Sequence, residues 1–291
     1  MTSRRPLLIQ IILYADDTAL LCKGKTVECI EAALTADLSR VSDWLFANKL
    51  TLNVSKTKTM LLGTRQRVRS RNLSIAMNGV VIENVSKFKY LGLMFDPCLD
   101  FNEHIDYMVK KLSKRVGILK RVSKFIDSYT LKTLYNAIIQ PHIDYCLPVW
   151  SMTNERLINK VQVVQNRAVR VIVGVGIRDM HVQDMYDNLR IMTVKQRASY
   201  LTACCVYKCT QLLMPGYLCE HFRPSSNRHS ARLSNGSTCL QVPRVKTETG
   251  RKAFSHSGPL LWNQLPNNIK NTTDLNRFKH VFKICTFNFV V

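Results

Sequence analysis

Two adjacent carboxylates, Asp16 and Asp17, stand between two strongly apolar runs in the stretch ILYADDTALLC. The flanking runs, Ile9–Leu13 and Thr18–Cys22, are rich in β-branched and aliphatic residues, which is typical of short strands. We therefore predict a β-hairpin with its bend at Tyr14–Asp17. A tight turn between buried strands would hold the carboxylates rigidly, and Mg²⁺ prefers such oxygen ligands. The alternative is ordinary turn chemistry, because Asp is a common turn residue.

The rest of the first third predicts a mixture of helix and strand. Thr26 can cap a helix that ends near Asn48, because apolar residues recur after it at helical spacing. Its predicted apolar stripe consists of Val27, Ile30, Leu34, Leu38, Val41 and Leu45. Asn78-Gly79 is typical of a two-residue hairpin turn. Further strands are predicted at Lys49–Asn53, Thr57–Leu62 and Lys87–Phe95.

From Asn102 onward the apolar spacing becomes helical, with breaks at Pro141 and Pro148. Residues 214–250 are rich in Pro, Ser, Asn and Arg, which favours a loose linker. A final compact element contains the stretch FSHSGPLLWNQLP. The predicted helices are Asn102–Phe125, Tyr129–Ile139, Asn154–Val173, Thr193–Leu212 and Asp274–Phe282.

The charge balance points to a polyanionic partner. The chain carries 42 Lys and Arg against 20 Asp and Glu, a formal net charge of +22, and nucleic acid is the first partner to expect. An anionic membrane surface is the alternative, although no stretch approaches the roughly 18 apolar residues of a membrane span. The N-terminal stretch imitates a signal peptide but lacks a cleavage site. The ten cysteines form no paired framework, so we expect reduced thiols and an intracellular protein, in the nucleus or cytoplasm.

Basic residues gather on particular elements. One side of the helix 102–125 is apolar, and the opposite side carries Lys110, Lys114, Arg121 and Lys124, a pattern suited to following a phosphate backbone. A merely solvated basic face is the alternative. Trp44 and Trp150 stand in apolar contexts and are predicted to be core residues rather than base-stacking ones. Further basic residues lie in a loop (Arg65, Arg67, Arg69, Arg71) and on the helix 154–173 (Arg156, Lys160, Arg167, Arg170).

Several segments, in order, resemble one family. Tyr14-Ala15-Asp16-Asp17 resembles the Y-x-D-D signature of reverse transcriptases. Residues 43–62 (DWLFANKLTLNVSKTKTMLL) and 88–96 (FKYLGLMFD) are similar to the succeeding motifs of non-LTR, LINE-type retrotransposon reverse transcriptases. Residues 147–174 and 258–283 resemble the region downstream of the polymerase in those elements.

The resemblance implies RNA-directed DNA synthesis by a two-metal scheme with Mg²⁺. It assigns the metal mainly to Asp16, with Asp17 as the weaker ligand, and to an Asp of an earlier palm strand. We expect this sequence to lack that strand and the fingers, and therefore to bind Mg²⁺ weakly and to polymerise negligibly on its own. Acidic residues on the following helix are expected to face solvent, away from the hairpin tip. These residues are Glu28, Glu31, Asp37 and Asp43.

Two further positions follow from the resemblance. Asn53-Val54-Ser55-Lys56 matches an N-x-x-K pattern that places Lys56 near the incoming triphosphate, with Lys58 close by. Tyr90, Leu91 and Gly92 match a loop that positions the primer end, where glycine lets the backbone approach a ligand. The alternatives are exposed strand-end lysines and a plain hairpin glycine.

We therefore predict an α+β chain with three regions. They are a partial reverse-transcriptase palm (1–96, an antiparallel sheet with a packing helix), a helical thumb and connection (97–180), and a helical C-terminal region (181–291) with a loose linker at about 214–250. The expected partners are the RNA and DNA of a template–primer duplex, with no membrane. The alternative functions are a non-catalytic, sequence-independent nucleic-acid-binding remnant and a degenerate open reading frame.

Zinc is not expected in the C-terminal region, although cysteines gather there. No C-x-x-C spacing occurs, and the adjacent cysteines fall within a helical apolar pattern. The residues that invite a zinc hypothesis are Cys204, Cys205, Cys209, Cys219 and His221.

Overall fold

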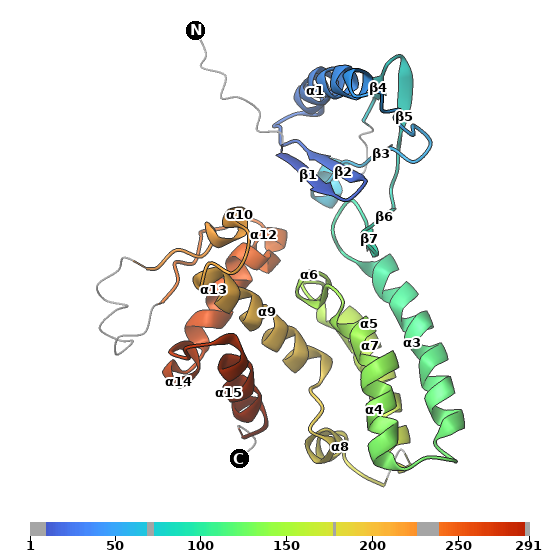
Figure 1. The fold of residues 1–291 in the computed structure, drawn as a ribbon, viewed down its shortest axis with the longest axis vertical. Helices are drawn as coiled ribbons and strands as arrows, with labels where there is room; N and C mark the ends of the chain where they lie inside the picture. The colour runs from blue at the N-terminus through green and yellow to red at the C-terminus, as the bar shows by residue number, and fades with distance from the viewer. Residues whose placement is uncertain (1–9, 69–72, 177–178, 226–238, 289–291) are drawn as a thin grey trace. The chain divides into compact units, whose positions relative to one another are not determined.

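The structure, a computed structural model, describes residues 10–68, 73–176, 179–225 and 239–288. The chain forms two compact units, residues 1–100 and 101–291, and each is described by itself (Figure 1). In its described residues, unit 1 mixes short strands with one long helix, and the described residues of unit 2 are helical apart from one isolated β-bridge. The expected mixture of α and β structure is therefore confirmed, whereas the division into three regions stays a prediction.

Unit 1 contains three small sheets where one antiparallel sheet was expected. The hairpins β1–β2 and β6–β7 are antiparallel, and a third sheet has the order β3-β5-β4 with β3 parallel to β5. The elements of this unit are β1 (Gln10–Tyr14), β2 (Asp17–Leu21), α1 (Val27–Ala47), β3 (Lys58–Thr59), α2 (Arg65–Val68), β4 (Ile75–Met77), β5 (Val80–Asn84), β6 (Phe88–Tyr90) and β7 (Leu93–Phe95).

The core of unit 1 lies where α1 packs beside β4 (Figure 1). The Thr26 hydroxyl accepts a hydrogen bond from the Cys29 backbone N–H at 3.3 Å, so the predicted N-cap is confirmed. The predicted apolar stripe of α1 contributes the buried Leu38 together with five partly buried side chains. The residues buried opposite the helix are Leu73, Ile75, Met77 and Ile82.

Two of the predicted strands were wrong. Residues 49–53 form no strand, because α1 ends there in a turn: Lys49 has a φ of 55° and the Leu50 N–H donates to the Leu45 carbonyl at 2.9 Å. Residues 87–95 form the β6–β7 hairpin, since Leu91 and Gly92 at its centre have φ values of 44° and 83°. The predicted Asn78-Gly79 turn is confirmed between β4 and β5.

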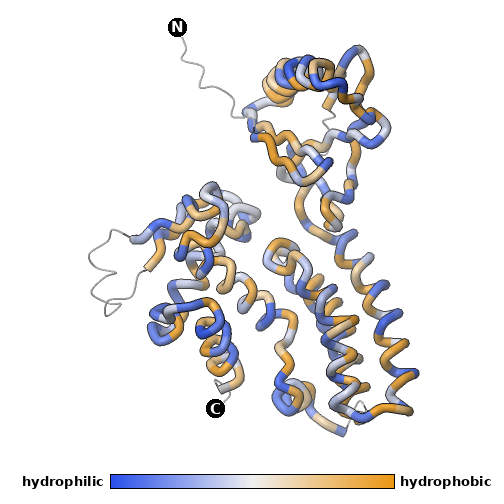
Figure 2. The backbone as a smooth tube through the Cα atoms, in the orientation of Figure 1, coloured by the Kyte–Doolittle hydropathy of each residue, from blue (hydrophilic) through white to orange (hydrophobic). Residues whose placement is uncertain are grey.

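Unit 2 begins with the long helix α3, which packs along α7, a second long helix later in the chain. Figure 2 shows hydrophobic and hydrophilic positions alternating along α3, as an amphipathic helix requires. The elements of this unit are α3 (Asn102–Val122), α4 (Ser128–Ile138), α5 (Gln140–Asp144), α6 (Leu147–Trp150), α7 (Glu155–Val173), α8 (Val182–Leu189), α9 (Val194–Thr210), α10 (Gly216–Cys219), α12 (Glu248–Lys252), α13 (Phe254–Gln264), α14 (Asn267–Lys270) and α15 (Leu275–Asn288).

The two prolines that break the helical pattern begin short helices. Pro141 lies in the first turn of α5 and Pro148 in the first turn of α6, where a missing N–H costs no hydrogen bond. The predicted helices of this unit are confirmed to within three residues, except that α15 continues six residues beyond the predicted end at Phe282. Asn154 caps α7 by accepting from the Leu157 N–H at 3.0 Å, and Gly174 ends it with a φ of 78°.

The helices α9, α13 and α15 enclose an aromatic core. The rings of Tyr207 and Phe278 lie 4.5 Å apart, and those of Trp262 and Phe278 are stacked at 6.1 Å. The described part of the expected loose linker also contributes to this core. Phe222 and Leu240 are buried in it, next to an antiparallel bridge between Pro224 and Leu240. Among the described helices of both units, none is long and apolar enough to cross a membrane.

Candidate functional site

The carboxylate pair lies at the tip of the β1–β2 hairpin, as predicted. Tyr14 pairs with Asp17 across the hairpin, so Ala15 and Asp16 are the two residues of the turn. Ala15 has a φ of 52°, the left-handed conformation that such short turns require. Asp16 therefore occupies the tip, and Asp17 is the first residue of β2.

The strands on either side of this turn are more exposed than predicted. Within the described residues, Ile11, Leu13 and Tyr14 retain 57%, 71% and 62% of their accessible surface. The expectation that the two strands of this hairpin are buried was therefore wrong. A two-stranded sheet covers neither of its own faces. Leu20 of β2 is the residue that packs against the core of this unit.

Asp16 and Asp17 fit a divalent cation by their chemistry. Both side chains are exposed, and carboxylate oxygens are the hard ligands that Mg²⁺ takes. Within the residues that the structure describes, no group of three or more His, Cys, Asp or Glu side chains could hold a metal ion. Two acids of α1 have other partners: Glu31 accepts from the Ser74 N–H at 2.6 Å, and Asp37 pairs with Arg40 at 3.0 Å. Among the described residues, Asp16 and Asp17 therefore supply at most part of the ligand set that a bound cation needs.

The two lysines near the N-x-x-K pattern have different surroundings. Asn53 begins a turn in which its side-chain oxygen accepts from the Lys56 N–H at 3.2 Å. This turn leaves the Lys56 side chain exposed. Lys58 instead forms an ion pair with Glu83 across the β3–β5 pairing. The structure therefore favours Lys56 over Lys58 as the lysine available to a ligand.

Tyr90, Leu91 and Gly92 lie at the end of the β6–β7 hairpin. The Tyr90 ring lies 6.5 Å from that of Phe95, and its buried hydroxyl has no hydrogen-bond partner in the described part of the chain. Gly92 is exposed with a φ of 83°. No hydrogen bond or ion pair among the described residues joins this turn or Lys56 to the side chains of Asp16 and Asp17.

The predicted basic face of α3 is exposed to solvent. Lys110, Lys114 and Arg121 are all exposed, whereas Leu112 and Leu119 on the apolar side are fully buried. Lys124 is exposed too, but it lies in the turn after the helix, because α3 ends at Val122. Three cations thus share one face of α3.

The other predicted basic residues are less uniform. Arg65 pairs with Asp100 at 2.8 Å, and Arg69 and Arg71 lie outside the described residues. On α7, Arg156 and Arg167 are exposed. Lys160 of the same helix pairs with Asp106 of α3 at 2.7 Å, so it is partly neutralised.

The cysteines of α9 have the surroundings of core residues. Cys204 and Cys209 are buried, and burial raises the pKa of both thiols, that of Cys209 to about 12. A protonated, buried thiol is a poor metal ligand, because the thiolate is the form that binds metal. The absence of zinc stays a prediction.

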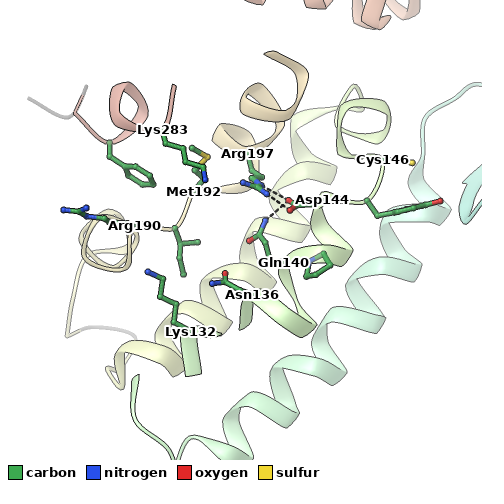
Figure 3. Close-up of a pocket in the computed structure, with 13 residues that line it drawn as sticks. Lys132, Asn136, Gln140, Asp144, Cys146, Arg190, Met192, Arg197 and Lys283 are labelled. Carbon is green, nitrogen blue, oxygen red and sulfur yellow. Dashed lines mark hydrogen bonds and ion pairs between the residues drawn. The ribbon is translucent and has the colours of Figure 1, made fainter. Parts of the chain in front are cut away.

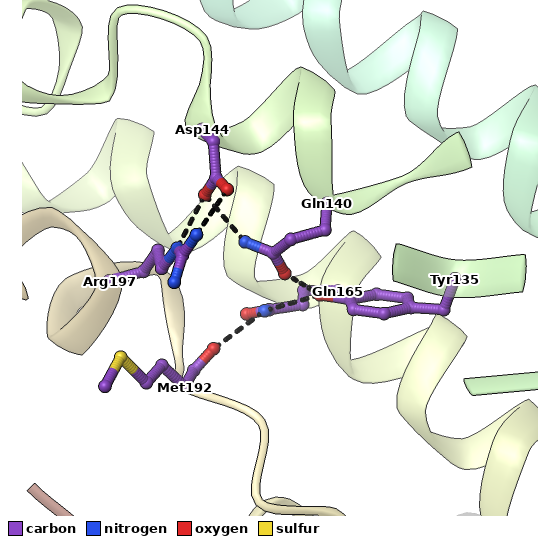
Figure 4. A network of polar contacts seen from close by, with 6 residues as sticks. All are labelled: Tyr135, Gln140, Asp144, Gln165, Met192 and Arg197. Atoms are coloured by element: carbon purple, nitrogen blue, oxygen red, sulfur yellow. Dashed lines mark hydrogen bonds and ion pairs between the residues drawn. The ribbon is translucent and has the colours of Figure 1, made fainter. Parts of the chain in front are cut away.

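Sequence reasoning missed a buried polar network in unit 2 (Figure 4). Gln165 donates to the Tyr135 hydroxyl at 2.9 Å, which donates to the Gln140 side chain at 2.7 Å. Gln140 in turn donates to Asp144 at 2.7 Å, and Asp144 pairs with Arg197. The available signal was Gln165, a polar residue within the apolar stripe of α7, whose side chain is fully buried.

Residues 2–95 match the family model of reverse transcriptase (RNA-dependent DNA polymerase). The chain is 25% identical over 169 residues to the RNA-directed DNA polymerase from mobile element jockey of Drosophila melanogaster, an alignment that covers 57% of this chain and 18% of that protein. It is 27% identical over 195 residues to a probable RNA-directed DNA polymerase from transposon BS of the same species, covering 65% and 21%.

A third relative is a Pol polyprotein from the type-1 retrotransposable element R1 2 of Nasonia vitripennis, 26% identical over 152 residues, covering 49% of this chain and 36% of that protein. No solved structure matches the chain. The alignments span about a fifth to a third of these relatives, and the expected resemblance to non-LTR retrotransposon reverse transcriptases is confirmed.

Proposed function

We propose, from this kinship with the reverse transcriptases of non-LTR retrotransposons, that the chain supplies part of an RNA-directed DNA polymerase. In this proposal residues 1–96 are part of the palm, with Asp16 and Asp17 at its nucleotidyl-transfer centre. The observation that carries it is the pairing of Tyr14 with Asp17 across a two-residue turn, within the segment that matches the family model. The turn presents both carboxylates at the end of a hairpin.

Asp16, and more weakly Asp17, would hold Mg²⁺, which supplies activation of the primer 3′-hydroxyl and stabilisation of the leaving pyrophosphate when it is bound. The exposed ammonium of Lys56 would neutralise part of the triphosphate charge. Gly92 has no side chain, so its backbone would let a primer end approach the β6–β7 turn closely. Tyr90 and Leu91 flank that contact.

The helical unit would contact the template–primer duplex. Lys110, Lys114, Arg121 and Lys124 are exposed, and a phosphate backbone is the ligand that several neighbouring cations favour. Contacts to phosphates carry no sequence information, so this binding is independent of sequence. We place the protein inside the cell, in the nucleus or cytoplasm, where such duplexes occur.

The 291-residue chain on its own would bind nucleic acid but extend primers negligibly. Two adjacent carboxylates repel each other, and a further acid ligand would be needed to hold the catalytic cations firmly. The second candidate function is therefore a non-catalytic nucleic-acid-binding protein, which the net charge of +22 favours. A degenerate reading frame is the third, and it predicts a chain that does not fold.

The test combines cation binding and primer extension on the full chain. Bound Mn²⁺, counted by electron paramagnetic resonance, should be weak and should be lost in Asp16→Asn but retained in Asp43→Asn, an exposed acid on α1. Extension of an RNA-templated primer with Mg²⁺ should stay near the detection limit. Cation binding that survives Asp16→Asn, or extension that survives it, would refute the role of Asp16. Robust extension abolished by Asp16→Asn would refute only the proposed inactivity of the chain alone.

A further inference from the structure

An open hollow of about 820 Å³ lies within unit 2 (Figure 3). Its walls come from α4, α5, the segment after α8, and the helices α9 and α15. A volume of this size is typical of ligand sites in proteins. Neither the palm nor the basic face of α3 contributes a residue to it.

The hollow is cationic. Its charged lining consists of Lys132, Arg190, Arg197, Lys283 and a single carboxylate, Asp144. Asp144 is already neutralised by Arg197, which donates to both of its oxygens. Figure 3 shows Lys132 and Lys283 extending into the hollow from opposite sides. No ion pair among the described residues engages these lysines or Arg190, although Lys283 Nζ lies 5.7 Å from the centre of the Tyr200 ring.

The backbone holds Arg190 in an unfavourable conformation. Arg190 ends α8 with φ 48° and ψ 46°, the left-handed region where glycine or asparagine is preferred. A residue with a β-carbon costs on the order of 1 kcal/mol there. This turn ends α8 at the edge of the cationic hollow, which Arg190 lines.

The rest of the lining suits a nucleotide strand. Tyr145 is half exposed and Phe287 is partly buried, so both line the hollow with aromatic rings on which bases can stack. The exposed amide of Asn136 can donate and accept hydrogen bonds. A hollow of about 820 Å³ has room for a few nucleotides of a single strand.

Hydrogen bonds hold one wall of the hollow in place. Arg197 and Asp144 belong to the hydrogen-bonded chain that runs through Gln140 and Tyr135 to the buried Gln165. A second polar chain extends it, because Gln162 donates to the Gln165 side-chain oxygen at 3.0 Å. Polar groups held in this way are preorganised for a ligand.

We infer that this hollow binds a single-stranded nucleic acid through its phosphates, at a site separate from the duplex contact proposed for α3. Lys132, Arg190 and Lys283 would contact phosphates, and Tyr145 and Phe287 would stack against bases. The inference adds a strand-binding site to the proposed function and does not depend on polymerase activity.

The test measures the binding of fluorescein-labelled dT12 and U12 by anisotropy, with a 12-base-pair duplex beside them. The combined variant Lys132→Gln, Arg190→Gln and Lys283→Gln should lose about tenfold or more in single-strand affinity, and its slope of log K against log salt should shrink by about 2. Its duplex affinity should change less than about twofold. The charge-matched control Arg244→Gln, Lys246→Gln and Arg277→Gln removes three exposed cations outside the hollow and should change single-strand affinity less than about twofold.

Equal losses in the two triple variants, or no loss in the first, would overturn the inference. Polyglutamate that competes as well as unlabelled dT12 would overturn the assigned ligand, and so would inorganic phosphate that displaces dT12 at equal phosphate concentration. Crosslinking of 5-iodouracil oligonucleotides to the unaltered chain avoids any folding defect. Adducts at Tyr145 or Phe287 would support the site, and adducts confined to α3 would refute it. These experiments measure binding and not primer extension. A negative result would therefore refute this inference without affecting the test of the proposed polymerase function.

Discussion

Arg197 holds Asp144 through two parallel hydrogen bonds, from Nε to Oδ1 at 2.8 Å and from Nη2 to Oδ2 at 2.6 Å. The two side chains are only 22% and 24% exposed, and they join α9 to the end of α5. Burial opposes the charge of the guanidinium, but the Asp144 carboxylate outweighs this and raises the pKa of Arg197. The Arg197 guanidinium therefore keeps its charge at any ordinary pH.

Replacing one partner of this pair should destabilise unit 2. Arg197→Gln leaves the Asp144 carboxylate half-buried without its counter-charge, and we expect the free energy of unfolding to fall by about 2–3 kcal/mol. Urea denaturation measures this. Lys195→Gln is the matched control, because the Lys195–Glu155 pair is largely exposed and its loss should leave the midpoint unchanged. The double variant Asp144→Asn with Arg197→Gln should be less destabilised than the sum of its single variants, and strict additivity would contradict the coupling.

Stability should fall in alkaline solution. Burial raises the pKa of Cys209 and of Tyr200 to about 12 each, from ordinary values of 9.0 and 10.0. Between the unfolded and folded values, the unfolded chain releases protons that the folded chain retains. The free energy of unfolding is therefore undiminished below about pH 9 and falls as the pH rises to about 12, by up to about 1.4 kcal/mol per pH unit for each group.

Urea denaturation at intervals from pH 8 to pH 11 checks this dependence. Tyr200→Phe removes one of the titrating groups and should flatten the decline above pH 10. Cys29→Ser changes an exposed thiol and should leave the decline unaltered. A free energy of unfolding that stays constant from pH 9 to pH 11 would contradict the prediction.

Helix ends and tight turns could be predicted from the sequence, because they depend on residues that are close together in the chain. Thr26 and Asn154 cap helices because their side-chain oxygens meet N–H groups three residues ahead. Trp44 shows the limit of context: its apolar neighbours suggested a core position, yet it is 59% exposed. At about 100° per residue, Trp44 lies roughly 40° beyond Ile30, just outside the edge of the stripe that packs on the core.

The polar network could not be predicted, because its members are far apart in the sequence. Asp144 and Arg197 are separated by 53 residues, and no spacing rule joins them. The hairpin tip, in contrast, was predictable because Tyr14 to Asp17 are consecutive. The exposure of the flanking strands was not predictable, because an apolar composition does not show whether another element covers a strand.

The Asn78-Gly79 turn should be sensitive to a β-carbon at Gly79. Gly79 has a φ of 77° and nothing lies within 4 Å of an added Cβ, so Gly79→Ala is strained in its backbone alone. We expect unit 1 to lose about 1 kcal/mol of stability in urea denaturation. Gly117→Ala is the contrasting control, because Gly117 is an exposed residue within α3 with open space around it and alanine is the better helix former there. A stabilising effect of Gly79→Ala would contradict the turn geometry.

The basic face of α3 should account for much of the salt dependence of duplex binding. Lys110, Lys114 and Arg121 lie within about 40° of one another around the helix axis, at about 100° per residue, so one phosphate backbone can meet all three. Each phosphate contact contributes about 0.9 to the slope of log K against log salt. Replacing all three by Gln should therefore reduce the slope by about 2–3 in anisotropy titrations with a labelled RNA·DNA duplex. The triple variant at Arg244, Lys246 and Arg277 removes the same charge from elsewhere in unit 2 and should reduce the slope by less than about 1. Equal slopes in the two variants would mean that the face of α3 is merely solvated, and that net charge alone attracts the duplex.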